Sequence, residues 1–272
     1  MSDLHLLRLA VDPAGLERVA RARRFGDEDD SGYRLHALLA GLFGDLAPAP
    51  WQLDGHSPGR NRVVWAYADQ PWESLQEVIH RRFEDPATVG LDADVISLLR
   101  GALAWEGCAS KPMPAFISGQ RVACDVRACA TVRVHADLPG IVATVDHGAV
   151  AARRAGDEVD VLVAEALRRS RSGSPVHMNK MDAIAIYTGW LRAALERLGG
   201  FTVEGVALTG HRQVQVIRKH HAQGGRRDMR LPEVIAGSTL MVTDPVAFRA
   251  ALVRGIGRHR AFGFGMLLLK PI

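Results

Sequence analysis

The sequence predicts an α+β fold in which one order of strands and helices occurs twice. The N-terminal half has the order β-α-β-β-α, and the C-terminal half repeats it, with a helical insertion and a closing strand. Between the halves, 109–119 contains two prolines. A β-α-β-β-α-β order is typical of ferredoxin-like domains. We therefore predict two tandem ferredoxin-like (RRM-like) domains, at 1–110 and 120–272, joined by a linker at 111–119.

Hydrophobic patterning defines the elements of the first half. Residues 4–11 form an apolar run suited to a strand, whereas the charged stretch 21–30 indicates a loop. An apolar stripe at helical spacing predicts a helix that begins at a capping residue, 30 or 31, and ends before the prolines of 45–50. The apolar segment 91–105 fits either a strand or a helix. Two strands and a helix are predicted between these segments, at 51–53, 62–68 and 72–83.

The second half is assigned in the same way. Its predicted strands are 121–135, 201–206, 212–220, 239–242 and 263–269. Its predicted helices are 157–170, 179–198 and 245–254. The last of these helices has Asp244 as its N-cap and Pro245 in its first turn, which is a strong start signal.

Composition is that of a soluble globular protein. Hydrophobic residues make up 47% and charged residues 24% of the 272 positions. No apolar run reaches the roughly 18 residues that would indicate a membrane span. The first residues also lack the basic start and apolar core of a signal peptide. We therefore expect a cytoplasmic protein that does not associate with membranes.

The sequence gives no sign of a metal or nucleotide cofactor. Its three cysteines form no CxxC pair, and its eleven histidines form no HExxH motif. No GxxxxGK[ST] motif is present. Its glycine cluster follows a helix and precedes a strand, whereas a dinucleotide fingerprint follows a strand and opens a helix. We assign neither a metal nor a nucleotide cofactor.

A glycine-rich loop near the C-terminus carries most of the functional information. It runs from Gly255 to Gly265 and includes three consecutive basic residues, Arg258, His259 and Arg260. Glycine can adopt positive φ, and successive free N–H groups in such a turn form a concavity suited to phosphate. A glycine-rich turn with merely solvated arginines is about equally consistent with these residue types.

Four segments resemble the RAMP superfamily of CRISPR-associated proteins, and above all its CasE type. The two specific matches are Tyr33-Arg-Leu-His36 on the first predicted helix and the glycine-rich loop Gly255–Gly265. Two weaker matches are Asp125-Val-Arg127-Ala128 and the helical segment 186–198. The CasE type is the endoribonuclease that processes CRISPR RNA in type I-E Cascade complexes. The resemblance therefore implies ferredoxin-like domains, CRISPR repeat RNA as substrate and other Cascade subunits as partners.

The resemblance also implies a catalytic set. Tyr33 and His36 are three residues apart, so they share one helix face. Histidine titrates near neutrality, so His36 would transfer the proton in metal-independent attack of a ribose 2′-OH. Tyr33 would orient the reacting groups or transfer the second proton, and Arg260 would stabilise the phosphate. The implied products carry a 2′,3′-cyclic phosphate and a 5′-OH. Taken alone, however, a histidine on such a helix is more often a capping or surface residue.

RNA binding is expected from the glycine-rich loop and from a basic hairpin at 212–230. Residues expected to bind RNA are Gly255, Gly257, Arg258, His259, Gly263, Gly265, Arg127, Arg218, Lys219, Arg226, Arg227 and Arg230. A-form RNA is recognised mainly by shape and phosphate contacts. The hairpin should therefore contribute a salt-dependent share of the affinity. A solvated turn is the alternative interpretation of the hairpin, at about even odds.

Several positions depart from the family pattern. The loop lysine of the family is replaced by Arg260, which keeps the charge but cannot donate a proton. Ala261 replaces a small hydroxyl residue, Cys129 replaces an asparagine, and the segment 136–175 is longer than in compact members. Two other classes of function stay open: a non-catalytic RAMP subunit that holds crRNA, and a small-molecule enzyme. The lack of a paired-carboxylate or nucleotide motif disfavours the second.

Overall fold

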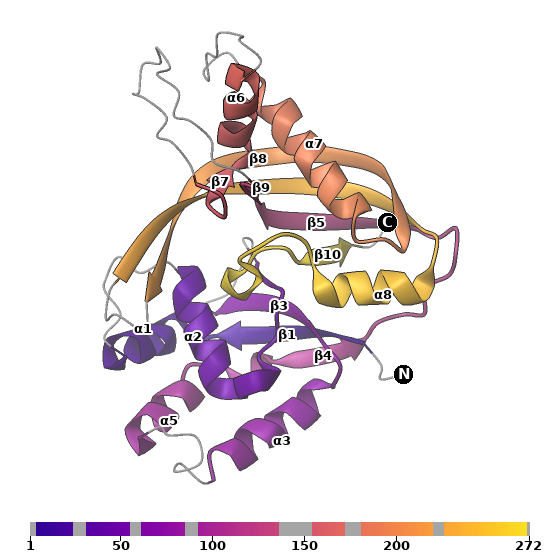
Figure 1. Cartoon of the computed structure of the whole chain (residues 1–272). Helices are drawn as coiled ribbons and strands as arrows, with labels where there is room; N and C mark the ends of the chain where they lie inside the picture. The colour runs from indigo at the N-terminus through magenta and orange to yellow at the C-terminus, as the bar shows by residue number, and fades with distance from the viewer. Residues whose placement is uncertain are drawn as a thin grey trace.

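A computed structural model contains two four-stranded antiparallel sheets, one from each half of the chain (Figure 1). The described residues are 4–23, 31–54, 61–84, 92–135, 154–171, 181–219 and 226–270. The predicted α+β class with tandem ferredoxin-like domains is confirmed. None of the described helices combines the length and the apolarity needed to cross a bilayer.

The first sheet has the strand order β2-β3-β1-β4. Its strands are β1 (His5–Val11), β2 (Trp51–Leu53), β3 (Arg62–Ala68) and β4 (Ala109–Pro112). The helices of this half are α1 (Pro13–Ala22), α2 (Ser31–Phe43), α3 (Trp72–Arg82) and α5 (Ala93–Arg100). Their apolar faces form one core with the sheet, in which Leu9, Leu38 and Ile79 are almost fully buried. The ambiguous segment 91–105 therefore contains a helix.

The second sheet has the strand order β10-β5-β9-β8. It consists of β5 (Arg121–Cys129), β8 (Phe201–Lys219), β9 (Arg226–Val242) and β10 (Leu267–Lys270). A small sheet pairs β6 (Thr131–Arg133) with β7 (Glu158–Asp160). The helices are α6 (Val161–Arg171), α7 (Ala183–Glu196) and α8 (Pro245–Arg254). If the strands of each four-stranded sheet are numbered in chain order, both sheets read 4-1-3-2, so the predicted repetition of one fold is present.

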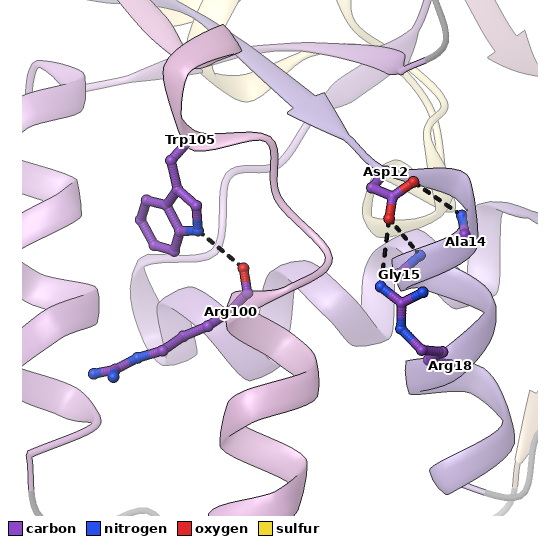
Figure 2. A network of polar contacts seen from close by, with 6 residues as sticks. All are labelled: Asp12, Ala14, Gly15, Arg18, Arg100 and Trp105. Atoms are coloured by element: carbon purple, nitrogen blue, oxygen red, sulfur yellow. Dashed lines mark hydrogen bonds and ion pairs between the residues drawn. The ribbon is translucent and has the colours of Figure 1, made fainter.

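Helix α1 is the one described α-helix that the sequence analysis did not predict. The carboxylate of Asp12 accepts hydrogen bonds from the backbone N–H groups of Ala14 at 3.2 Å and Gly15 at 2.9 Å (Figure 2). Pro13 occupies the first turn, where its missing N–H costs nothing. The helix extends to Ala22 and so includes the start of the stretch expected to be a loop. Residues 24–30 of that stretch lie outside the described part of the chain.

A similar contact closes the C-terminal end of α5. The indole N–H of Trp105 donates to the carbonyl of Arg100 at 2.9 Å (Figure 2). The last carbonyls of a helix have no partner inside the helix, so this bond satisfies one of them. Trp105 also packs against Trp72 at the start of α3, with ring centroids 5.7 Å apart. The two helices are thereby fixed to each other at the edge of the first core.

Three predicted elements in the second half, two strands and one helix, were wrong in extent. The predicted strand 121–135 is divided at Ala130, because β5 and β6 belong to different sheets. The predicted helix 157–170 begins with the strand β7 before α6. The closing strand begins at Leu267 rather than at residue 263, because Gly263 and Gly265 have positive φ.

The two strands predicted at 201–206 and 212–220 are one long strand, β8. Its register against β9 shifts between Val203 and Gly205 and again between Leu208 and Gly210. A β-bulge inserts an extra residue without ending a strand, and glycine is common there. Gly210 lies in the gap between the two predicted strands, where the structure has a register shift and not a strand end. Residues 220–225 at the hairpin tip lie outside the described residues.

The two halves share apolar contacts across their junction. Leu6 and Tyr67 of the first sheet belong to the same buried cluster as Met266 and Leu267 of the second half. The hydroxyl of Tyr67 donates to the carbonyl of Leu267 at 2.9 Å. The strand β4 also runs two residues past position 110. The division into 1–110, 111–119 and 120–272 stays a proposal.

Candidate active site

The glycine-rich loop leaves α8 at Gly255 and packs against the N-terminal half. All four of its glycines have positive φ, as does His259, which is the only such non-glycine residue in the described part of the chain. At Gly263 an added Cβ would lie 2.6 Å from the ring of Trp51, which is on β2. At Gly265 it would lie 2.1 Å from the carbonyl oxygen of Ile256. Both glycines therefore allow approaches that a side chain would prevent.

Hydrogen bonds from both halves hold the loop in this position. The indole N–H of Trp51 donates to the carbonyl of Ala261 at 3.0 Å. A guanidinium N–H of Arg127 donates to the carbonyl of Gly263 at 3.0 Å, and the backbone N–H of Gly265 donates to the carbonyl of Arg127 at 2.7 Å. Arg127 was expected to bind RNA. In the structure, its guanidinium and its backbone carbonyl hold the glycine-rich loop in place.

Arg127 is itself oriented by a buried carboxylate. Glu233 on β9 is fully buried and pairs with both Arg127 and Arg212. The Arg127 guanidinium also lies over the ring of Phe264, 4.3 Å from its centroid. A buried carboxylate is stable only when it is paired and hydrogen-bonded, so the two arginines and Glu233 form one unit.

Phe262 joins the loop to the helix that carries Tyr33 and His36. Its ring is stacked on Tyr33 with centroids 6.3 Å apart and an interplanar angle of 14°. The centroid of His36 lies 5.1 Å from the same ring, and that of His259 lies 6.2 Å from it. The structure therefore brings together Tyr33, His36 and the loop, although more than 200 residues separate them in the chain. Figure 1 shows α2 beside this part of the loop.

Burial sets the protonation of His36. The side chain is half-buried on α2, and this desolvation lowers its pKa from the ordinary value of 6.5. The neutral imidazole is therefore the dominant form at neutral pH. A neutral imidazole can accept a proton from a hydroxyl group.

A second network fixes the basic part of the loop. Glu158 on β7 contacts a ring nitrogen of His259 at 2.7 Å and the guanidinium of Arg258 at 3.6 Å, and it accepts a hydrogen bond from Thr131 at 2.5 Å. Burial alone would raise the pKa of Glu158, but the hydrogen bonds from His259 and Thr131 and the adjacent charges lower it to about 2. The carboxylate is therefore ionised at neutral pH and pairs with the loop.

One group in the described residues has donors that fit a divalent metal. The sulfur of Cys129, a carboxylate oxygen of Glu158 and a ring nitrogen of His259 lie within 4.8 Å of one another. Glu158 already contacts His259, Arg258 and Thr131. Burial raises the pKa of the Cys129 thiol to about 12, so it is protonated as the site stands. In this arrangement the group acts as a hydrogen-bond network.

Arg258 and Arg260 line one cavity and define the basic face of the glycine-rich loop. The guanidinium of Arg260 donates to the carbonyl of Arg254, and Gly255 and Gly257 line the same cavity. The catalytic role expected for Arg260 stays a proposal.

The basic hairpin projects from the second sheet as the ends of β8 and β9. The register places Arg218 opposite Arg227 and Lys219 opposite Arg226, although the side chains of these four residues are outside the described part. Arg230 is exposed on β9. The hairpin brings these basic residues to one end of the sheet.

Sequence reasoning missed four residues of the site: Phe262, Glu158, Glu233 and Trp51. Phe262 was the easiest to find, because a large aromatic residue between glycines in a polar loop needs a packing partner. The two glutamates gave no local signal, since each lies on a strand far from the loop in sequence. Their roles depend on pairing between distant strands.

Comparison with known proteins identifies the family. The sequence profile of a family described as CRISPR associated protein matches residues 4–271. Among solved structures, Thermus thermophilus Cse3 bound to an RNA representing a pre-cleavage complex is 22% identical, with a TM-score of 0.57, over 99% of this chain and 100% of that chain. A chain of a CRISPR RNA-guided surveillance complex in a pre-nicking state is 16% identical, with a TM-score of 0.55, over 98% and 100%.

Another CRISPR-associated protein, also from Thermus thermophilus, is 20% identical, with a TM-score of 0.50, over 98% of this chain and 100% of that chain. No curated protein sequence matches the chain. The structural likeness supports the fold, and the profile extends over nearly the whole sequence. The family expected from the two terminal motifs is confirmed: the chain belongs to the CRISPR-associated protein family.

Proposed function

We propose that this protein is a metal-independent endoribonuclease that cleaves CRISPR repeat RNA at the base of a stem-loop. The observation that carries the proposal is the contact of Phe262 with Tyr33 and His36, because it joins a proton-transfer residue to a phosphate-binding loop. The RNA-bound Cse3 structure of the same fold supports RNA as the substrate class. The surveillance-complex chain supports a lasting position as a Cascade subunit.

The proposed reaction is an internal transfer at one phosphodiester. His36 accepts the proton of the ribose 2′-OH, and the 2′-oxygen forms a bond to phosphorus. The bond from phosphorus to the 5′-oxygen breaks, and that oxygen receives a proton, which leaves a 2′,3′-cyclic phosphate and a 5′-OH. The lowered pKa of His36 favours the neutral form that the first step needs.

The other residues act on orientation and charge. Tyr33 lies one turn before His36 and is stacked on Phe262, so it is placed to orient the ribose or to supply the second proton. The phosphorane carries additional negative charge, which N–H donors and cations of the loop stabilise. Arg258 and Arg260 supply this charge at the loop, and the basic hairpin contributes affinity along the RNA stem.

The test is cleavage of a labelled repeat hairpin RNA in EDTA by the wild type and by His36→Ala. We expect one cleavage site without metal, and a rate for His36→Ala lower by roughly 1,000-fold, within the range for loss of a general base. RNA binding should persist in the variant. The measurement is a single-turnover time course on a denaturing gel.

His80→Ala is the matched control. His80 is also a helical histidine of the first half that packs on an aromatic ring, with its centroid 5.6 Å from that of Trp105. We expect it to cleave at the wild-type rate. Equal cleavage by His36→Ala and the wild type would remove His36 from the chemistry. Binding without cleavage by the wild type would instead favour a subunit that only holds crRNA.

A further inference from the structure

A cavity lies between the basic face of the glycine-rich loop and helix α7. Its volume is about 450 Å³, which is in the range of small-ligand pockets. Neither Tyr33 nor His36 nor Phe262 lines it, so it is separate from the residues proposed for proton transfer. Arginines, one indole and several apolar side chains line it, including Arg197, Arg254, Arg258, Arg260, Trp190 and Ile256.

The cavity carries an excess of positive charge. Among the residues that the structure describes, four arginines and no carboxylate line it. Arg258 has an ion pair, at 3.6 Å from Glu158. Arg254 donates to the carbonyl of Leu198 at 2.5 Å, and Arg260 donates to that of Arg254. Because a guanidinium has five N–H donors, both side chains keep donors for a ligand. Such a concentration of arginine in a concave site attracts phosphate.

Trp190 gives the cavity a second kind of recognition. It is half-buried on α7, and a Cβ added at Gly257 would lie 4.0 Å from its ring, so the loop passes at the edge of the indole. Trp190 also lines a neighbouring groove of about 360 Å³ between α6 and α7. The ring is thus reached from two sides. Nucleobases stack on such a ring regardless of their sequence.

An arginine cluster beside an accessible indole fits a nucleotide, since it offers a partner to the phosphate and to the base. The loop that forms one wall also carries Phe262, which contacts His36. An RNA strand bound at this loop therefore passes both the cleavage residues and the cavity. Only an unpaired base presents its face for stacking on a side chain.

We propose that this cavity binds one unpaired nucleotide of the RNA strand that flanks the cleavage site. The base stacks on Trp190, and the phosphate is held by Arg197 and Arg254. This inference rests on the proposed function. It adds a selection for RNA with a single-stranded flank beside the stem.

The test compares two labelled RNAs by fluorescence anisotropy: a repeat hairpin with single-stranded flanks and the same hairpin trimmed to the stem-loop. We expect Trp190→Leu to weaken binding of the flanked RNA roughly tenfold, within the range for loss of one stacked base. The loss should be confined to the flanked RNA. Trp190→Phe keeps an aromatic face and should restore most of the affinity.

A pair of arginine variants provides the matched control. Arg197→Gln should weaken binding of the flanked RNA, whereas Arg81→Gln should not, although both residues are exposed near the C-terminal end of a helix. Adenosine monophosphate is tested for quenching of Trp190 fluorescence. Tight binding of this mononucleotide that flanked RNA does not displace would overturn the proposal in favour of a small-molecule site.

Cleavage measured in the same samples distinguishes this inference from the proposed function. If the wild type cleaves and Trp190→Leu binds flanked RNA as tightly as the wild type, the pocket proposal is wrong and the endoribonuclease proposal stands. A second outcome is that the wild type cleaves no hairpin RNA, yet it prefers the flanked RNA and Trp190→Leu does not. In that case the pocket proposal stands and the endoribonuclease proposal is wrong.

Discussion

The two halves of this molecule share one strand order and differ in what they add to it. In the first half, β2 has 3 residues and β3 has 7, and the chemistry-bearing residues lie on the covering helix α2. In the equivalent places of the second half, β8 has 19 residues and β9 has 17, and the glycine-rich loop precedes the last strand. One copy of the fold thus presents a helix face, and the other presents a loop and a long basic hairpin.

Neither half of the molecule holds a complete site. Tyr33 and His36 come from the first half, whereas Phe262 and the loop arginines come from the second. The loop reaches the first half because Gly263 and Trp51 pack without an intervening side chain. If this division is correct, changes that displace the loop should affect both stability and cleavage, and changes within one half should affect one property.

The largest combined effect, on stability and cleavage together, is expected for Gly265→Ala in the glycine-rich loop. An added Cβ would lie 2.1 Å from the carbonyl oxygen of Ile256, and φ is +82°. Backbone strain and overpacking together should lower the free energy of unfolding by about 3 kcal/mol. Displacement of the loop from His36 should lower the cleavage rate roughly 100-fold. Urea unfolding and single-turnover cleavage measure the two effects.

Gly119→Ala separates these causes. Gly119 has the same φ of +82°, but an added Cβ would meet nothing within 4 Å. This variant should show the backbone strain alone, about 1 kcal/mol, with cleavage near the wild-type rate. Equal losses of cleavage in the two variants would mean that loop packing does not control the site.

A smaller effect, on binding alone, is expected for Arg230→Gln in the second half. Arg230 is exposed on the basic hairpin. Loss of one phosphate contact should weaken RNA binding a few-fold and reduce the slope of log K against log salt by about 1. Arg21 is exposed on α1, and the control variant Arg21→Gln should leave the slope unchanged. An unchanged slope for Arg230→Gln would remove the hairpin from the RNA interface.

The smallest effect, a shift in a pH profile, is expected from the first half. Burial lowers the pKa of His36 below 6.5, so the neutral base persists as the solution becomes acidic. The single-turnover rate should therefore fall only when the pH drops below 6.5, and His36→Ala should lack this acid limb. An acid limb centred above 6.5 would contradict a buried His36 as the base.

Local signals predicted the elements whose causes lie within a few residues. The apolar stripe of α2 and the Asp244 cap of α8 were both found in this way. The same kind of signal at Asp12 and Pro13 could have revealed α1, because a capping side chain followed by proline is a helix start. The sequence analysis divided β8 in two around Gly210, because the register shift beside Gly210 becomes visible only in the pairing with β9.

Three features could be predicted from the sequence alone: the repeated α+β order, the glycine-rich loop and the shared helix face of Tyr33 and His36. They could be predicted because periodicity and φ preference are local properties of the chain. The tertiary structure alone reveals that Phe262 joins that face to the loop and that Glu158 pairs with Arg258 of the loop. It reveals in the same way that Glu233 holds Arg127, which in turn donates to the loop backbone at Gly263. It also decided that Arg260 lies in the cavity beside Trp190. These relations depend on packing between residues far apart in the chain, and burial then sets the pKa values that the chemistry uses.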